Sequence, residues 1–334
     1  MNTAIQNKKI LVTGGAGFIG SHVCERLLGH GYRVISVDNF NDFYDPAIKH
    51  ANMAAVLTNP QHPNFINYRE DIRNGDEMIR LFEMQQPDAV IHLAAMAGVR
   101  PSIENALLYS DVNIRGTQNI LEACIGIGVR HVIFASSSSV YGNNKKVPFS
   151  ESDPVDHPIS PYAATKKAGE LLCHTYAHLY GMAIYCLRFF TVYGPRQRPD
   201  LAIHKFSRLM LEDREIPFFG DGSTARDYTY IDDIVMGITT ALERNFAERK
   251  KVHEIINLGG SKTISLNEMV EVLEDCLGKK ARRRVLAKQA GDAERTHADI
   301  TKANRLLQYE PYTDFRTGVG EFISWLNAPL RMSA

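Results

Sequence analysis

The sequence has few cysteines, and their spacing does not indicate that any two of them pair. The 334 residues include five, and no two form a CxxC pair: Cys24, Cys124, Cys173, Cys186 and Cys276. An odd number of widely separated cysteines predicts neither a disulfide framework nor a zinc site. We therefore expect a reducing, cytoplasmic compartment and no metal centre.

The sequence also lacks an excess of either charge and any long apolar run. Lys and Arg total 38, and Asp and Glu also total 38, so the formal net charge is zero. Without a positive field, nucleic-acid binding is not expected. No apolar run reaches the roughly 18 residues that suggest a transmembrane helix. Residues 1–9 lack the apolar core of a signal peptide. We therefore expect no membrane partner.

The first 190 residues alternate short apolar runs with longer amphipathic stretches. The runs lie at 10–12, 32–37, 65–68, 89–93, 131–135 and 183–187. Helix-like segments lie at 19–28, 112–125 and 161–180. Continuous apolar runs are typical of parallel strands that are buried on both faces. The alternation predicts an α/β fold with a doubly wound parallel sheet and right-handed crossovers.

Proline and glycine become frequent after residue 190, and the strand–helix rhythm becomes less regular. We predict a domain boundary there, with a dinucleotide-binding domain at 1–190 and a smaller, mixed α/β substrate domain at 191–334. Part of 228–258 is expected to return to the first domain. The basic stretch at 279–284 is interpreted as a solvated loop, with a phosphate contact as the alternative.

A glycine-rich segment follows the first apolar run. Residues 13–20 read TGGAGFIG, so Gly14, Gly17 and Gly20 satisfy GxxGxxG, while Gly15 replaces Gly14 in GxGxxG. Glycine there permits a tight turn, close approach to a pyrophosphate and close packing of helix on strand. The N-terminus of the following helix offers free N–H groups to phosphates. The segment predicts a dinucleotide site.

Acidic residues end the second and third predicted strands. Asp38 lies 18 residues after Gly20, where a carboxylate accepts hydrogen bonds from ribose hydroxyls and repels a 2′-phosphate. Asn39, not an arginine, follows it, so we predict NAD rather than NADP. A helix cap or turn residue is the alternative for Asp38. Asp71 could meet the adenine amine or be a simple loop carboxylate.

Tyr162 and Lys166 form a YxxxK pair within the helix-like segment at 161–180. Their i,i+4 spacing places both side chains on one helical face. A nearby ammonium favours the phenolate, so we expect the pKa of Tyr162 to fall towards neutrality, which suits a general base. A surface tyrosine and a solvated lysine are the alternative. The serines at 136–139 end the fifth predicted strand, where side chains face the ligand crevice.

Six motifs occur in order along the chain: TGGAGFIG (13–20), HLAA (92–95), SSSSVYG (136–142), YAATK (162–166), RFFTVYGPRQRPD (188–200) and DGSTARDYTYIDDI (221–234). Together they resemble the extended short-chain dehydrogenase/reductase family of nucleotide-sugar epimerases and dehydratases. The resemblance implies a Rossmann-type sheet and NAD as the cofactor. It also implies a homodimer formed through the segments 112–125 and 161–180.

The resemblance assigns roles to individual residues. It makes Ser137 the catalytic partner of Tyr162, with Lys166 as the third catalytic residue. It places Ser138 and Ser139 at the sugar. The expected cofactor contacts are Gly14, Gly17, Phe18, Ile19, Gly20, Asp38, Asn39, Asp71, Ile72, Leu93, Ala94, Ala95, Asn113, Tyr162 and Lys166.

The family resemblance also narrows the reaction. The family's dehydratases carry Asp-Glu directly after the catalytic hydroxyl residue, and its decarboxylases carry a glutamate just before Val-Tyr-Gly. Here those positions are Ser138 and Ser139. Hydroxyl groups do not readily supply that acid–base chemistry near neutral pH. We therefore predict a 4-epimerase, in which the 4-keto sugar turns over before hydride returns to it.

The substrate is read from the same resemblance. Arg226 matches a diphosphate ligand and Asp292 a ligand of the nucleotide ribose, so a UDP-sugar is expected. Thr191 stands where galactose-type enzymes have asparagine, and Arg198 matches an arginine that holds a C6 carboxylate. Within the family the chain is most like UDP-glucuronate 4-epimerases. The alternatives are epimerisation of UDP-glucose/UDP-galactose or N-acetylhexosamines, and a non-catalytic NAD-binding scaffold.

Overall fold

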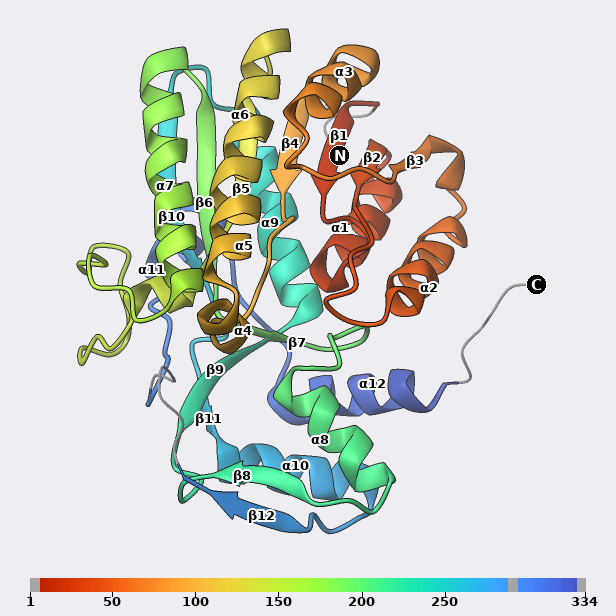
Figure 1. The fold of residues 1–334 in the computed structure, drawn as a ribbon, viewed down its shortest axis with the longest axis vertical. Coiled ribbons are helices and arrows are strands. Elements are labelled where there is room, and N and C mark those ends of the chain that lie inside the picture. The colour runs from red at the N-terminus through yellow and green to blue at the C-terminus, as the bar shows by residue number, and fades with distance from the viewer. Residues whose placement is uncertain (1–6, 288–293, 329–334) are drawn as a thin grey trace.

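The computed structural model describes residues 7–287 and 294–328 (Figure 1). Its centre is a sheet of seven parallel strands in the order β10-β6-β5-β4-β1-β2-β3. The strands are β1 (Lys9–Thr13), β2 (Arg33–Val37), β3 (Phe65–Tyr68), β4 (Ala89–His92), β5 (His131–Ser137), β6 (Ala183–Phe189) and β10 (Val252–Leu258). The predicted doubly wound sheet is confirmed, and each of the six apolar runs contributes a strand.

Helices cover both faces of this sheet (Figure 1). One face carries α1 (Phe18–Gly29), α2 (Pro46–Leu57) and α9 (Ile231–Phe246), which pack on one another. The opposite face carries α3 (Gly75–Gln85), α6 (Gly116–Ile127) and α7 (Pro161–Tyr180). Two separate apolar clusters fill the two sheet–helix interfaces. This burial on both faces explains why the strands read as continuous apolar runs.

The helix expected at 112–125 is interrupted in the structure. After α4 (Val99–Glu104) and α5 (Ala106–Ser110), the chain makes a π-helical turn, η2 (Asp111–Arg115), before α6 begins. Asn113 lies in that turn, and its amide bonds to the backbone of Met96 and to Thr165 Oγ1. These three tertiary hydrogen bonds fix the Asn113 side chain within the π-helical turn. Such π turns are frequent at functional sites.

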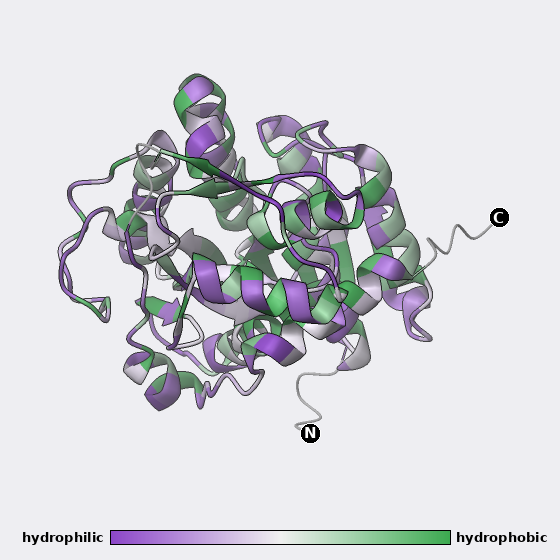
Figure 2. Cartoon of the chain, turned by 90° about the horizontal axis from the view of Figure 1, so that it is seen from below, coloured by the Kyte–Doolittle hydropathy of each residue, from purple (hydrophilic) through white to green (hydrophobic). Residues whose placement is uncertain are grey.

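Most of the remaining elements lie below the carboxyl ends of the central strands (Figure 1). A three-stranded sheet has the order β11-β9-β7, and β8 pairs in parallel with β12. The strands are β7 (Thr191–Tyr193), β8 (Ile216–Phe219), β9 (Ala225–Tyr230), β11 (Thr263–Ser265) and β12 (Arg283–Leu286). Helix α11 (Thr301–Leu307) packs on α9 and β10. The helices of the lower part are α8 (Ala202–Leu211), α10 (Leu266–Leu277) and α12 (Phe315–Asn327). Seen from below, these helices mix hydrophilic and hydrophobic residues, as helices that cover a core do (Figure 2).

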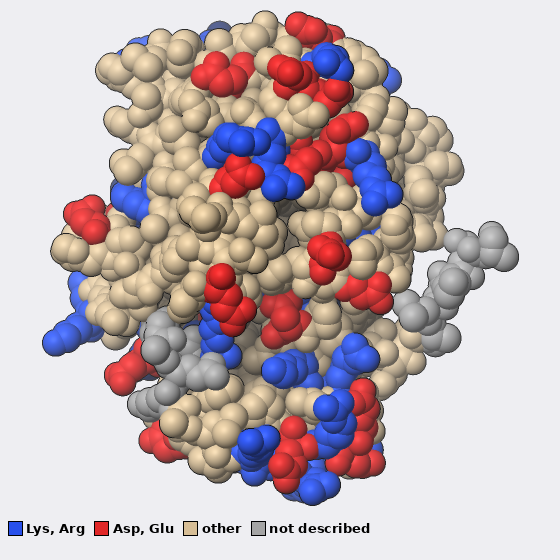
Figure 3. Space-filling view, in the orientation of Figure 1, with Lys and Arg blue, Asp and Glu red and all other residues tan. Residues whose placement is uncertain are grey.

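The surface shows the balance of charge that the composition predicts. Acidic and basic side chains are interspersed over the face drawn in Figure 3, without a continuous field of one sign. Within the basic stretch, Lys279 pairs with Asp213 and Lys280 with Glu274, as on a solvated face. None of the described helices is long and apolar enough to cross a membrane.

Candidate active site

A cavity of about 470 Å³ opens at the carboxyl ends of the central strands. This is the edge of a doubly wound sheet at which ligands bind. The glycine loop, the end of β5, the first turns of α7, and residues of β7 and β9 all contribute to its wall. Every predicted site residue that the structure describes lines this cavity, except Asn113. Asp292 lies outside the described residues.

The glycine loop has no room for side chains. Gly14 has φ +70°, a conformation that favours glycine. A Cβ on Gly20 would fall 2.1 Å from the Gly14 carbonyl oxygen, and one on Gly15 would fall 2.1 Å from Ser36 Oγ. Gly17 caps α1 without a side chain, and the first turn holds no acidic residue. The N–H groups of α1 are therefore open to an anion such as a pyrophosphate.

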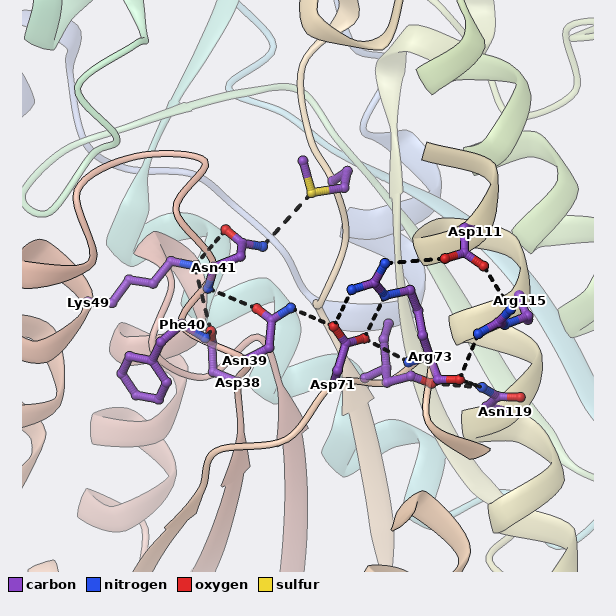
Figure 4. Close-up of polar contacts among 12 residues, drawn as sticks. Asp38, Asn39, Phe40, Asn41, Lys49, Asp71, Arg73, Asp111, Arg115 and Asn119 are labelled. Atoms are coloured by element: carbon purple, nitrogen blue, oxygen red, sulfur yellow. Dashed lines mark hydrogen bonds and ion pairs between the residues drawn. The ribbon is translucent and has the colours of Figure 1, made fainter. Parts of the chain in front are cut away.

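Asp38 lies beside a lysine that sequence reasoning missed (Figure 4). Its carboxylate accepts hydrogen bonds from the Phe40 and Ala16 amides, at 2.8 and 3.2 Å. Lys49 Nζ on α2 lies 3.7 Å away, and both side chains are at most 7% exposed. The Asp38 side chain therefore faces the cavity. Backbone amides hold it in place, and Lys49 partly balances its charge. Nothing in the sequence around Asp38 indicated Lys49. The chain turns after Asp38, and α2 then brings Lys49 back to the carboxylate.

Asp71 is part of an ionic chain across the rim of the cavity (Figure 4). The Arg73 fork donates to both carboxylate oxygens, at 3.0 and 2.8 Å, and Asn39 Nδ2 donates at 2.9 Å. Burial alone would raise the pKa of Asp71, but these hydrogen bonds outweigh it and lower the pKa to about 2. Arg73 continues to Asp111, which also pairs with Arg115. Asp71 is thus fixed and ionised beside the cofactor loop.

Tyr162 and Ser137 meet as the YxxxK spacing and the end of β5 predict. Ser160 caps α7 through the Ala163 amide, which places Tyr162 in the first turn. The Ser137 side chain lies close enough to the Tyr162 phenol to lower its pKa. Lys166 Nζ donates to the Ala135 carbonyl at 2.7 Å and lies 5.9 Å from the centre of the Tyr162 ring. The three side chains share one wall of the cavity.

The expected fall in the pKa of Tyr162 is wrong for this structure. Burial raises the pKa of the phenol, and only the Ser137 hydrogen bond and the charge of Arg198 oppose that rise. Lys166 does not offset it, because its ammonium is directed at a backbone carbonyl. Burial also lowers the pKa of Lys166 to about 8. The spacing predicted the pair but not the low-polarity surroundings that decide its charge state.

Hydroxyl groups line the wall next to Tyr162. Ser138 and Ser139 begin the short helix η3 (Ser138–Tyr141), and Ser137 Oγ accepts from the Ser139 amide at 3.2 Å. Ser139 Oγ is buried without a hydrogen-bond partner in the described chain. Thr191 faces the cavity from β7. An unpaired buried hydroxyl in a cavity wall fits a polar ligand.

Arg198 provides a positive charge to the cavity from the loop after β7. Its Nε and Nη2 atoms donate to Asp200 at 3.0 and 2.8 Å, and the Phe43 ring lies 5.2 Å from its guanidinium carbon. Its side chain is 15% exposed. Burial would lower the pKa of Arg198, but Asp200 raises it. Sequence reasoning did not identify Asp200 as the partner, although it lies only two residues further along the chain.

Arg226 lies on β9, one of the strands below the central sheet, and it lines the cavity. Its Nη1 atom donates to the Ala225 carbonyl at 3.0 Å. No carboxylate is recorded within ion-pair distance of Arg226 among the described residues. A guanidinium held only by carbonyl groups keeps its charge available to an anionic ligand.

Comparison with known proteins identifies the family. Residues 10–259 match the model of the NAD dependent epimerase/dehydratase family. The chain belongs to this family. A UDP-glucuronate 4-epimerase of Thermodesulfobacterium geofontis is 46% identical over 316 residues, covering 94% of this chain and 95% of that protein. Protein CapI of Staphylococcus aureus is 41% identical over 330 residues, covering 95% and 98%.

Solved structures of epimerases share the fold. UDP-glucuronic acid 4-epimerase from Bacillus cereus, in complex with UDP-glucuronic acid and NAD, has a TM-score of 0.88 and 41% identity. The match covers 95% of this chain and 98% of that one. UDP-glucose 4-epimerase from Thermotoga maritima, with UDP-glucose, has a TM-score of 0.85 and 33% identity, covering 95% and 98%. The chain is therefore an NAD-dependent epimerase by family.

The residues of the cavity fit the cofactor of this family. The glycines of the loop line the cavity without side chains, and the open N-terminus of α1 suits a pyrophosphate. The Asp38 carboxylate faces the same cavity and suits the hydroxyls of a ribose. The Asn113 side chain does not line the cavity, but its bonds to Met96 hold the loop after β4, which does. Its contact with the cofactor stays a prediction.

Proposed function

We propose that this epimerase interconverts UDP-glucuronate and UDP-galacturonate through a 4-keto intermediate. The observation that carries the proposal is Arg198, whose side chain is 15% exposed, lines the same cavity as Tyr162 and acts electrostatically on it. A carboxylate on C6 of the sugar is a group that the positive charge of Arg198 would recognise beside its partner Asp200. The relatives named for UDP-glucuronate support this choice of sugar.

The chain's own residues perform the proton chemistry. NAD, when bound, supplies the hydride acceptor and donor. Tyr162 takes the proton of the 4-hydroxyl group, with Ser137 sharing the hydrogen bond, and gives it back on the return step. Lys166 supplies positive charge beside the phenol and would contact the nicotinamide ribose. Ser138 and Ser139 hold the sugar by hydrogen bonds and carry no carboxylate that would drive water loss.

We also assign the remaining contacts. Arg226 binds the diphosphate, and Asp292 binds the nucleotide ribose. Thr191 contacts the sugar, while Asp38, Asn39 and Asp71 contact the adenosine part of NAD. Residues 1–190 with part of 228–258 form the cofactor domain, and the rest of 191–334 forms the nucleotide-sugar domain.

The protein is proposed to be a cytoplasmic homodimer. All five cysteines lie in the described ranges and are free thiols, and four of them are buried, which supports a reducing compartment. Exposed leucines support the dimer, because they leave apolar surface on neighbouring helices. Leu107 on α5 is 87% exposed, and Leu171 and Leu179 on α7 are 56% and 64% exposed.

Arg198→Ala tests the choice of sugar. We expect kcat/KM for UDP-glucuronate to fall by about 10- to 100-fold, because a hydrogen bond to a charged group contributes about 1.5–3 kcal/mol. The value for UDP-glucose should change far less. Arg214→Ala is the control, since Arg214 is 66% exposed and outside the cavity. Product sugars are separated by chromatography. An unchanged ratio of the two kcat/KM values would contradict the uronate assignment.

A further inference from the structure

A buried ion pair lies directly behind the catalytic residues. Arg188 on β6 donates to both carboxylate oxygens of Glu170 on α7, from Nε at 2.8 Å and from Nη2 at 2.9 Å. Both side chains are 1% exposed. Burial alone would raise the pKa of Glu170, but Arg188 outweighs it and lowers the pKa, so the pair is ionised. Sequence reasoning gave neither residue of the pair a role.

Glu170 belongs to a series of contacts that dock α7 on β5. Tyr162, Lys166 and Glu170 are four residues apart and share one face of the helix. Along that face, Tyr162 meets Ser137, Lys166 Nζ donates to the Ala135 carbonyl at 2.7 Å, and Ser136 Oγ donates to Glu170 Oε1 at 2.7 Å.

The same helix approaches the strand closely. A Cβ on Gly169 would fall 2.3 Å from the ring of Phe134. Residues 134–137 at the end of β5 therefore contact successive turns of α7, the helix that carries Tyr162. The Glu170 contact is the ionic member of this series.

Arg188 extends the same network under the sugar-binding turn. In the sheet register it lies opposite Ser136 on one side and Asn257 of β10 on the other. Its guanidinium carbon lies 4.8 Å from the centre of the Tyr141 ring, and Tyr141 OH donates to Asn257 Oδ1 at 2.7 Å. Tyr141 ends η3, which begins with Ser138 and Ser139. One guanidinium therefore contacts both the base helix and the turn that carries the sugar-side serines.

The pair is better suited to fixing geometry than to adding stability. The desolvation of two buried charges offsets most of their attraction, so buried pairs are weak evidence for stability. Arg188 Nη1 also has no hydrogen-bond partner in the described chain, which makes the arrangement still less favourable. A bidentate fork, however, allows one relative orientation of its partners.

We propose that Glu170 and Arg188 are positioning residues of the reaction. They hold the Tyr162 phenol on α7 against the Ser137 hydroxyl on β5, and they do not touch the substrate or the cofactor. This inference rests on the epimerase activity proposed above. Loss of the pair would move Tyr162 away from Ser137 without removing either group, so the chemical step would slow while ligand binding would persist.

Two substitutions separate positioning from folding. Glu170→Gln keeps the shape of the side chain but removes its charge, and Ser136→Ala removes one hydrogen bond without leaving a buried charge. We expect kcat for UDP-glucuronate to fall by about 10- to 100-fold in Glu170→Gln, since small misplacements of reacting groups cost up to about 100-fold. Ser136→Ala should lose less. KM and the NAD content per folded chain should stay within about twofold of wild type.

The pH profile provides the readout that a purely structural role would not move. Ser137 lowers the pKa of Tyr162, so separating the two side chains should move the ionisation of Tyr162, followed in the pH profile of kcat/KM, to higher pH. Lys167→Met is the matched control. Lys167 lies 3.7 Å from the same carboxylate, but its side chain is 22% exposed and lies outside the cavity. It should leave both kcat and the profile unchanged.

The outcomes are decisive in each direction. A lower kcat with the Tyr162 ionisation shifted to higher pH in folded Ser136→Ala supports the proposal, and it does so even if Glu170→Gln does not fold. If both variants fold and show the wild-type kcat per NAD-loaded chain and the wild-type pH profile, the proposal is overturned. Wild-type turnover of UDP-glucuronate is measured first. Its absence would refute the proposed function itself, whereas unchanged variants of an active wild type refute only the positioning role.

Discussion

Tyr162 and Lys166 lie in surroundings that oppose the charged form of each. Burial raises the pKa of the phenol and lowers the pKa of the ammonium to about 8. The base form of Tyr162 therefore becomes more populated as pH rises, while Lys166 loses its charge above about pH 8.

We expect kcat/KM with UDP-glucuronate to rise with pH and to level off near pH 8. Above that pH the gain in ionised Tyr162, whose pKa burial raises, is offset by the loss of charge on Lys166, whose pKa is about 8. Lys166→Met should lower kcat by about 100-fold or more and remove the levelling-off, so that the remaining activity keeps rising with pH. Initial rates measured across the pH range at fixed ionic strength check this. A levelling-off near pH 8 that persists in Lys166→Met would assign it to another group.

At the scale of elements, α1 shows how one helix start is specified by its glycines. The strand β1 is followed at once by a turn in which Gly14 adopts a positive φ and Gly20 packs on its carbonyl. A helix that begins so close to the strand presents its N–H groups to the cavity. The glycine spacing predicted this arrangement correctly, because no other residue type fits those contacts.

Gly20→Ala should disrupt the cofactor loop. The new Cβ would fall 2.1 Å from Gly14 O, so we expect the free energy of unfolding to drop by about 1–3 kcal/mol, the usual cost of overpacking. Retained NAD, measured by release and chromatography, should fall with it. Gly29→Ala in the same helix is the control, because no atom lies within 4 Å of its Cβ position. That variant should gain up to about 1 kcal/mol. Full NAD retention in Gly20→Ala would refute this account.

At the scale of the whole molecule, α5 and α6 follow one another end to end through η2, and α7 packs alongside both on one flank (Figure 1). Their outer surfaces carry the exposed leucines of α5 and α7. Apolar side chains this exposed are stabilised when a second copy covers them. The same flank contains the ends of helices that hold Tyr162 and Asn113, so association there would brace the cavity wall from behind.

Charged substitutions on this flank should separate the proposed dimer. We expect Leu107→Glu with Leu171→Glu to shift the mass in light scattering from about twice 37.5 kDa to 37.5 kDa, because two carboxylates would have to be desolvated at the interface. Leu57→Glu on α2 is the control, since Leu57 is 50% exposed on the opposite face of the sheet. A wild-type chain that is monomeric at micromolar concentration would contradict the proposed dimer.

The sequence by itself determined the features that local constraints encode. Strands buried on both faces must be apolar throughout, so six of the seven central strands could be read directly. A glycine with no room for a Cβ marks the cofactor loop, and a four-residue spacing places Tyr162 and Lys166 on one face. Each of these signals depends only on neighbouring residues of the chain.

Only the tertiary structure decided which charges meet and how strongly each is buried. Lys49 reaches Asp38, Arg73 reaches Asp111, and Arg188 lies against Glu170. The crossovers of the sheet bring Arg188 and Glu170 together, and burial determines the direction of the Tyr162 pKa shift. Residue spacing predicts neither the Arg188–Glu170 contact nor the direction of the pKa shift, because electrostatic energies depend on distance through space and on the exclusion of water.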